Sequence, residues 1–261
     1  SYGNPTASTD SPFDDPDGFK FGEDEDQNLI KCGSYTGNGD ATNGTEVYLG
    51  FEPQWVLIKS TGFTEHWHCF DCMRGMVNGG NDARLEINQS NSSETNTVDF
   101  LDIHPDGFTA KFVNNVNANN ENFVYIAVRR PDGYVGRTPE AGTDVFGLAD
   151  SIASNDVEYI SGFPVDYALA RRPGASENWY ATGRLNQKSW MYTNQTNTEN
   201  QAGSTNEQFM FDDSRGWSTQ SWGTSYQSWM WKRNAGFDVV NYKGDGSSGR
   251  GILTHWDKSQ K

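Results

Sequence analysis

Apolar and polar side chains alternate over short stretches throughout the chain. The clearest stretches are EVYLGF, QWVLIKS, NFVYIAVRR, DYALARR and QSWMWKR, which begin at residues 46, 54, 122, 166 and 227. Clusters of Asn, Gly, Ser, Asp and Pro separate them, and a helical period is almost absent. Alternation with a period of two is typical of strands with one buried face, and the polar clusters are typical of turns. The pattern therefore predicts an all-β protein.

The strand pattern occurs twice in the chain. LGFEPQWVLIKSTGFTEHW at 49–67 aligns with SGFPVDYALARRPGASENW at 161–179, an offset of 112 residues (179 − 67). Further on, NQSNSSE at 88–94 returns as NQTNTE at 194–199, and the strand YIAVRR at 125–130 returns as SWMWKR at 228–233. Internal similarity over such a period indicates repeated structural units. We predict two tandem β-sandwich units of jelly-roll or lectin-like type.

Four segments follow from this alignment. The first unit is predicted at 35–137 and the second, more divergent unit at 138–237. Residues 1–34 resemble the end of a preceding unit, because PDGF at 16–19 returns at 105–108 near the end of the first unit. Residues 238–261 resemble the start of a following unit or a C-terminal extension, because YKGDGS at 242–247 resembles the opening YTGNGD at 35–40.

The repeated PDGF stretch is interpreted as a turn followed by a buried strand. Pro favours the first corner of a turn, Asp the position beside it, and Gly a positive φ. We expect Gly107 to supply that positive φ and Phe108 to begin the buried strand. The second unit keeps only the Gly–aromatic pair, as Gly216 and Trp217. The stretch is therefore read as a fold signal rather than a site.

Composition narrows the possible partners. Apolar residues make up 34% of the chain and aromatic residues 13%, which favours a folded protein with a thin, aromatic core. The net charge is −15 with no concentrated basic face, so we expect no nucleic-acid partner. No apolar run approaches the ~18 residues that a membrane-spanning helix needs, so we expect no membrane insertion.

Two polar clusters contain residue types that can bind metal ions. In EHWHCFDC at 65–72, a strand would place His66 and His68 on one face but would point Cys69 and Cys72 apart. A satisfied strand face is preferred there over a His66/His68 metal pair. The acidic stretch at 14–26 offers carboxylates to Ca²⁺ but lacks the EF-hand spacing, and both alternatives stay open. We predict no metal site and no cofactor.

Tryptophan and tyrosine rings favour sugar binding because they cover the C–H faces of a pyranose. Within GWSTQSWGTSYQSWMWKR at 216–233, Trp229 and Trp231 align with Ile126 and Val128 and are predicted to lie in the core, as is Trp217. Two other tryptophans are the candidates for ligand binding. Trp222 lies beside Gly223 with no apolar counterpart, and Trp190 aligns with the polar region around Leu85.

Catalytic groups are not evident in the sequence. Glu65 and Glu177 occupy matching positions in the two units, as do Asp102 and Asp212, and paired carboxylates serve glycoside hydrolysis. Each lies in a polar, turn-rich stretch, and the sequence motifs of serine esterases, zinc proteases and P-loop enzymes do not occur. We predict no catalytic residue.

The order of motifs resembles a known family. Tyr35–Gly39 reads Y-x-G-N-G, and it is followed by LGF-x-P-x-W-V-L-I-K, H-W-x-x-x-D-x-x-R-G, D-G-F and a closing YIAVRR strand. This combination resembles a β-domain that occurs, often in tandem, in structural and tail proteins of tailed phages such as marine cyanophages. The second unit departs from the pattern, since VFGLADSIASND replaces the opening and TGRL replaces the R-G step.

The resemblance implies a non-enzymatic virion structural protein, located in a tail, in a fibre or on a capsid, and therefore in the extracellular particle. Its expected partners are other virion proteins, further copies of itself (three if it forms a fibre) and a glycan of the host surface. The alternative function is a carbohydrate-binding or glycan-processing β-sandwich module.

Overall fold

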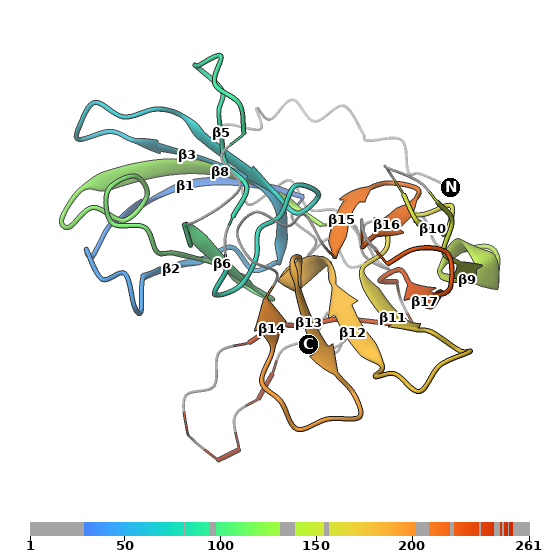
Figure 1. The fold of residues 1–261 in the computed structure, drawn as a ribbon. Coiled ribbons are helices and arrows are strands. Elements are labelled where there is room, and N and C mark those ends of the chain that lie inside the picture. The colour runs from blue at the N-terminus through green and yellow to red at the C-terminus, as the bar shows by residue number, and fades with distance from the viewer. Residues whose placement is uncertain are drawn as a thin grey trace.

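The computed structural model describes residues 29–80, 82–93, 98–130, 139–153, 157–201, 209–219, 222–234, 236–242, 246, 248–249 and 251–252. Four antiparallel sheets make up the described fold, two in each half of the chain. The predicted all-β fold is confirmed. In Figure 1 the strands of the first half, drawn blue to green, lie beside those of the second half, drawn yellow to red. The acidic stretch at 14–26 lies outside the described residues.

A five-stranded sheet and a three-stranded sheet form the first unit. The large sheet has the order β1-β8-β3-β4-β5, with bounds Ile30–Thr36, Asn122–Arg129, Pro53–Ser60, His68–Asp71 and Leu85–Glu86. The small sheet has the order β2-β7-β6, with bounds Thr45–Tyr48, Gly107–Ala110 and Leu101–His104. Alternation along β8 buries Phe123, Tyr125 and Ala127 and leaves the residues between them more exposed. One face of the large sheet is therefore the core face.

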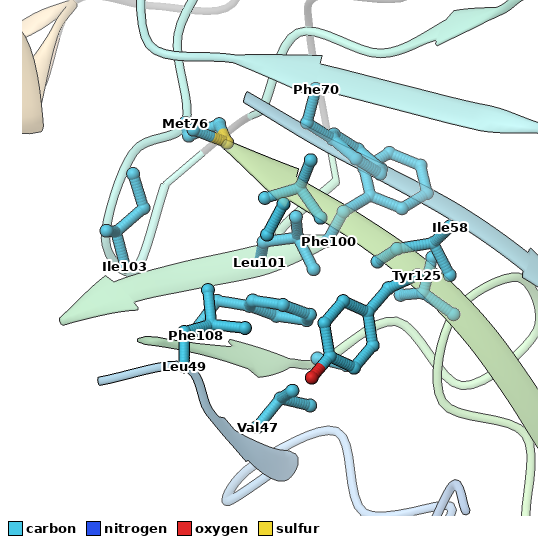
Figure 2. Close-up of a cluster of buried hydrophobic side chains, with 14 of the residues drawn as sticks. Val47, Leu49, Ile58, Phe70, Met76, Phe100, Leu101, Ile103, Phe108 and Tyr125 are labelled. Atoms are coloured by element: carbon cyan, nitrogen blue, oxygen red, sulfur yellow. The ribbon is translucent and has the colours of Figure 1, made fainter. Parts of the chain in front are cut away.

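The core of the first unit lies between these two sheets. Ile58, Phe70 and Tyr125 from the large sheet meet Val47 and other side chains from the small sheet (Figure 2). Phe108 of β7 packs edge-on against Tyr125 of β8, with 5.8 Å between ring centroids. Two sheets that share one interdigitated core form a β-sandwich.

The second unit has the same plan of one large and one small sheet. Its large sheet has the order β14-β13-β12-β11-β17-β9, with bounds Asn200–Gln201, Ser189–Tyr192, Tyr180–Gly183, Tyr167–Arg171, Gln227–Trp231 and Phe146–Asp150. Its small sheet has the order β10-β16-β15, with bounds Tyr159–Ile160, Gly216–Ser218 and Met210–Asp213. Trp217 is fully buried and stacks between Tyr159 and Phe211, as predicted for a core residue.

Strand pairing repeats from one unit to the other. The strand orders of the two large sheets match when one of them is read in reverse. β8 then corresponds to β17, β1 to β9, β3 to β11, β4 to β12 and β5 to β13. In the small sheets, β2, β7 and β6 correspond to β10, β16 and β15. β1 pairs with β8 along Ile30–Thr36, so residues 30–34 belong to the first sheet rather than to a preceding unit.

The Gly of the PDGF stretch has a different role from the one predicted. Pro105 and Asp106 form the turn between β6 and β7, but Gly107 does not have a positive φ. A Cβ at Gly107 would lie 2.0 Å from the Val47 carbonyl oxygen, and one at Gly216 would lie 1.9 Å from that of Tyr159. Both glycines are required because the neighbouring strand passes too close for a side chain. The other PDGF and PDGY copies lie outside the described residues.

The two units are joined through a buried contact. A short 3-10 helix, η3 (Arg184–Asn186), follows β12 of the second unit and places Leu185 in the core cluster of the first. Arg184 Nη1 lies 2.9 Å from Met73 Sδ, and Gln187 Nε2 donates to the Cys72 carbonyl oxygen at 3.1 Å. A side chain of one unit therefore completes the core of the other.

Four buried charged side chains extend this junction. Arg233 of the second unit binds Glu52 of the first at 2.5 Å, and Arg130 of the first binds Asp238 at 2.9 Å. The remaining pairs close the square, at 3.5 Å from Arg130 to Glu52 and 3.6 Å from Arg233 to Asp238. The alternation of two arginines and two carboxylates offsets the cost of burying each charge. Asp238, which begins the predicted C-terminal segment, thus contacts both units.

Candidate functional site

Two matching segments, one leading into β4 of the first unit and one leading into β12 of the second, are held by the same set of hydrogen bonds. In the first unit, Asn88 Oδ1 accepts from the Trp67 N–H at 3.1 Å, and the side-chain amides of Asn88 and Gln89 lie 3.2 Å from His66 Nδ1. The second unit repeats each bond with Asn194, Gln195, Trp179 and Asn178, at 3.0–3.1 Å. The same scaffold therefore carries different side chains in the two units.

In the second unit this place is aromatic. Tyr180 of β12 lies between Trp222 and Tyr192, with centroid distances of 4.2 and 5.2 Å, and Tyr226 lies 4.6 Å from Trp222. All four rings are partly exposed, and three of them pack on the second core. We call Tyr180, Tyr192, Trp222 and Tyr226 the ring cluster.

A carboxylate lies at the edge of the ring cluster. The Tyr226 hydroxyl donates to Glu177 Oε2 at 2.6 Å, and Arg172 contacts Glu177 Oε1 at 3.4 Å. Burial, together with the hydrogen bond to this carboxylate, raises the pKa of Tyr226, so its hydroxyl remains the donor. Aromatic faces beside a fixed carboxylate are groups that recognise sugars, the rings through C–H contacts and the carboxylate through hydroxyl groups.

The two tryptophans predicted from sequence meet at one core residue. Trp190 stacks on Phe209 with centroids 4.7 Å apart, and Trp222 meets the same ring edge-on at 5.0 Å. In the first unit, Arg84 takes the place of Trp190 and lies over Phe100, the counterpart of Phe209, at 4.8 Å. Trp190 therefore packs over the core residue Phe209, whereas Trp222 belongs to the ring cluster.

The prediction that Trp229 and Trp231 lie in the core is wrong. Along β17 the buried side chains are Ser228 and Met230, and both tryptophans are only partly buried. Ile126, the counterpart of Trp229, is itself 37% exposed on the outer face of the first large sheet. The alignment of the two strands was correct, but the face assigned to the aligned positions was not, because a strand has side chains on both faces.

In the first unit the same place carries histidines and carboxylates. Among the residues that the structure describes, Glu65, His66 and Glu86 form a group whose ligand atoms all lie within 4.8 Å of one another. His68 is fully buried beside them, with Nε2 at 3.4 Å from Glu65 Oε1. Burial and the nearby Arg84 charge lower the pKa of His68 to about 4, so its ring is neutral at pH 7.

The sequence pattern identified only part of this group. The strand pattern predicts that His66 and His68 share one face. Glu86 was missed because it lies 18 residues beyond His68 in the chain, and it reaches the group only because β5 pairs with β4 in a register that sets Glu86 opposite His68.

The three cysteines are free thiols. Cys69 is buried in β4 and Cys72 packs against the first core, and burial raises the pKa of both, that of Cys72 to about 11. Cys32 is exposed in β1. The two buried thiols therefore remain protonated and weakly nucleophilic at neutral pH.

Comparison with known proteins adds one finding. Residues 21–130 match the model of a family described as a domain of unknown function (DUF7483). This segment contains every strand of the first unit, from β1 to β8. No curated protein and no solved structure matches the chain.

Proposed function

We propose that this protein is a non-enzymatic structural component of a tailed-phage particle, in a tail, a fibre or a capsid-associated position. The observation that supports it best is the junction, where two copies of one β-sandwich share buried contacts. Leu185 fills the neighbouring core, and the square of Glu52, Arg130, Arg233 and Asp238 spans the boundary. Repeated rigid units suit a part that extends from a particle and holds a fixed direction.

Self-association belongs to the same proposal. Exposed apolar side chains gather on the outer faces of both large sheets, namely Ile30, Val124, Ile126, Phe146 and Leu148. Apolar patches of this kind mark surfaces that another protein covers. Their cover is further copies of the chain, three in a fibre, or neighbouring virion proteins.

The test is the composition of the purified particle whose genome encodes the chain. Quantitative mass spectrometry is expected to find the protein at a copy number set by the symmetry of the particle. A cryo-EM map is then expected to contain density for two consecutive sandwiches at each copy. Absence of the protein from intact, infectious particles would rule out the virion role.

A second candidate function is carbohydrate binding by the second unit, and the ring cluster with Glu177 favours it. Trp222→Ala removes the central ring, while Trp229→Ala removes a ring of similar exposure on the outer sheet face and is the matched control. On a glycan array, binding by the unaltered protein and by Trp229→Ala, but not by folded Trp222→Ala, is the expected result. Equal binding by all three would exclude the ring cluster.

Glycan processing is tested separately from binding. The processing form of this candidate uses Glu177 as an acid or base and predicts that reducing ends are released from host polysaccharide. Release that is lost in Glu177→Gln would support it, and no release from any polysaccharide that the array identifies would exclude it.

A further inference from the structure

We propose that Glu65, His66, His68 and Glu86 of the first unit form a binding site for one divalent transition-metal ion such as Zn²⁺. Two imidazoles and two carboxylates are a ligand set that this class of ion prefers, whereas Mg²⁺ and Ca²⁺ prefer oxygen alone. The ligand atoms of Glu65, His66 and Glu86 lie within 4.8 Å of one another, and Glu65 Oε1 is 3.4 Å from His68 Nε2. Ligands held at ~2.1 Å from Zn²⁺ lie ~3.4 Å apart, so small side-chain rotations complete the site.

The state of His68 is independent support for this site. Its side chain is fully buried, and neither ring nitrogen has a hydrogen-bond partner among the residues that the structure describes. A buried polar group left in this way has lost its hydration without gaining a partner, so it favours binding of a group that supplies one. Nε2 faces the Glu65 carboxylate, and the side chain of Glu86 lies on the same face of the sheet, directly opposite on β5. An ion between these groups gives Nε2 a partner.

The surroundings are compatible with a bound cation. Among the residues that the structure describes, Arg84 is the cationic side chain paired with the group, at 3.2 Å from Glu86 Oε1, and it also lies over the Phe100 ring. Within the described part of the chain, the hydrogen-bond contact of Glu86 Oε2 is with the exposed Asn91 amide at 3.4 Å. Glu65 and Glu86 together therefore exceed the charge of Arg84 by one negative charge, which favours a divalent ion.

The amides around His66 decide which ring nitrogen binds. Asn88 and Gln89 occupy Nδ1, which leaves Nε2 for the ion. A histidine bound through Nε2 carries a proton on Nδ1 and donates it to an oxygen. Rotation of the exposed Gln89 amide about its last bond brings its carbonyl oxygen to that position, while the Asn88 amide nitrogen, whose oxygen stays on the Trp67 N–H, no longer donates to Nδ1.

The second unit is an internal control for this site. Its scaffold is the same, but Asn178, Tyr180 and Tyr192 stand in place of His66, His68 and Glu86, and only Glu177 is kept. The ion is therefore expected in the first unit alone. His66→Asn places in the first unit the residue that the second unit holds in the same cage of amides, so this variant is expected to fold.

The test uses the full chain, stripped with a chelator and titrated with Zn²⁺ or Co²⁺ alone. Native mass spectrometry is expected to find one ion per chain, and Co²⁺ is expected to give the visible absorption of a low-coordinate site with nitrogen ligands. His66→Asn and Glu86→Gln are each expected to lower the affinity at least about tenfold. The matched second-unit variant Glu177→Gln is expected to leave the affinity unchanged.

A separate experiment locates the bound ion in the chain. With ¹⁵N-labelled histidine, the ring resonances of His66 and His68 are expected to shift on adding Zn²⁺, while those of His104 in β6 stay in place. No bound ion at micromolar Zn²⁺, or binding that His66→Asn and Glu86→Gln leave unaltered, would overturn the proposal. Circular dichroism of each variant separates loss of a ligand from loss of the fold.

Discussion

Leu185→Ala is expected to destabilise the first unit although Leu185 belongs to the second. Its side chain is 4% exposed and packs in the core cluster that includes Phe70 and Met76. Truncation of a buried leucine costs about 2–5 kcal/mol, and the cost rises with the cavity that remains. Hydrogen bonds hold η3 in place: the Asn78 N–H donates to the Leu185 carbonyl oxygen, and Gln187 Nε2 donates to the Met73 carbonyl oxygen. The surrounding residues therefore cannot move in to fill the cavity that the truncation leaves. We therefore expect a loss of about 3–4 kcal/mol.

The assay follows the two units with separate probes in urea. Trp179, Trp190, Trp217, Trp222, Trp229 and Trp231 make fluorescence chiefly a report on the second unit, whereas reactivity of the buried Cys69 thiol reports on the first. In the unaltered protein both probes are expected to change in one transition. In Leu185→Ala the thiol transition is expected to move to a lower urea concentration by about 1 M or more, ahead of the fluorescence.

The matched control is Leu148→Ala in β9, where the leucine is 56% exposed. Its loss is expected to stay within about 0.5 kcal/mol. This expected loss of stability would be refuted if Leu185→Ala had no greater effect than Leu148→Ala. It would also be refuted if both probes shifted together in Leu185→Ala, since the truncated contact would then not separate the stabilities of the two units.

Three further predictions concern the junction, the close strand contact and the buried histidine. Glu52→Gln leaves Arg130 and Arg233 with one shared carboxylate, and it is expected to lower the free energy of unfolding in urea by about 3–5 kcal/mol. An unchanged urea midpoint would show that the square contributes nothing to stability. Gly107→Ala forces a methyl group against the Val47 carbonyl and is expected to lower stability by roughly 1–3 kcal/mol, whereas Gly142→Ala, with open space around it, is expected to be neutral. His68 has its folded-state pKa lowered from 6.5 to about 4, so below pH 6.5 the unfolded state takes up a proton that the folded state does not. In metal-free protein this costs up to about 3 kcal/mol of stability as the pH falls from 6.5 to 4, and His68→Gln is expected to lose that part of the pH dependence; equal slopes in both proteins would contradict it.

The repeat was the most informative feature of the sequence because it relates positions rather than predicting each one separately. It placed Trp217 with Phe108, and both are fully buried. The same alignment paired Trp231 with Val128 correctly, and both lie on the outer face of a large sheet. Alternation shows that a strand has two different faces, but which one is covered depends on where the small sheet packs.

Sequence alone determined the fold class, the existence of two units, most strand positions and the candidacy of Trp222, because these follow from local alternation and internal repetition. Tertiary structure decided which groups meet. Glu86 lies near His66 because β5 pairs with β4, Tyr180 of β12 packs against Trp222 from the loop before β17, and Leu185 lies in the core of the other unit. Such contacts join residues far apart in the chain, and no local pattern records them. The physical reason is that the period of the sequence specifies the direction of each side chain relative to its own strand. The residues that this side chain contacts are decided by how complete sheets pack against one another.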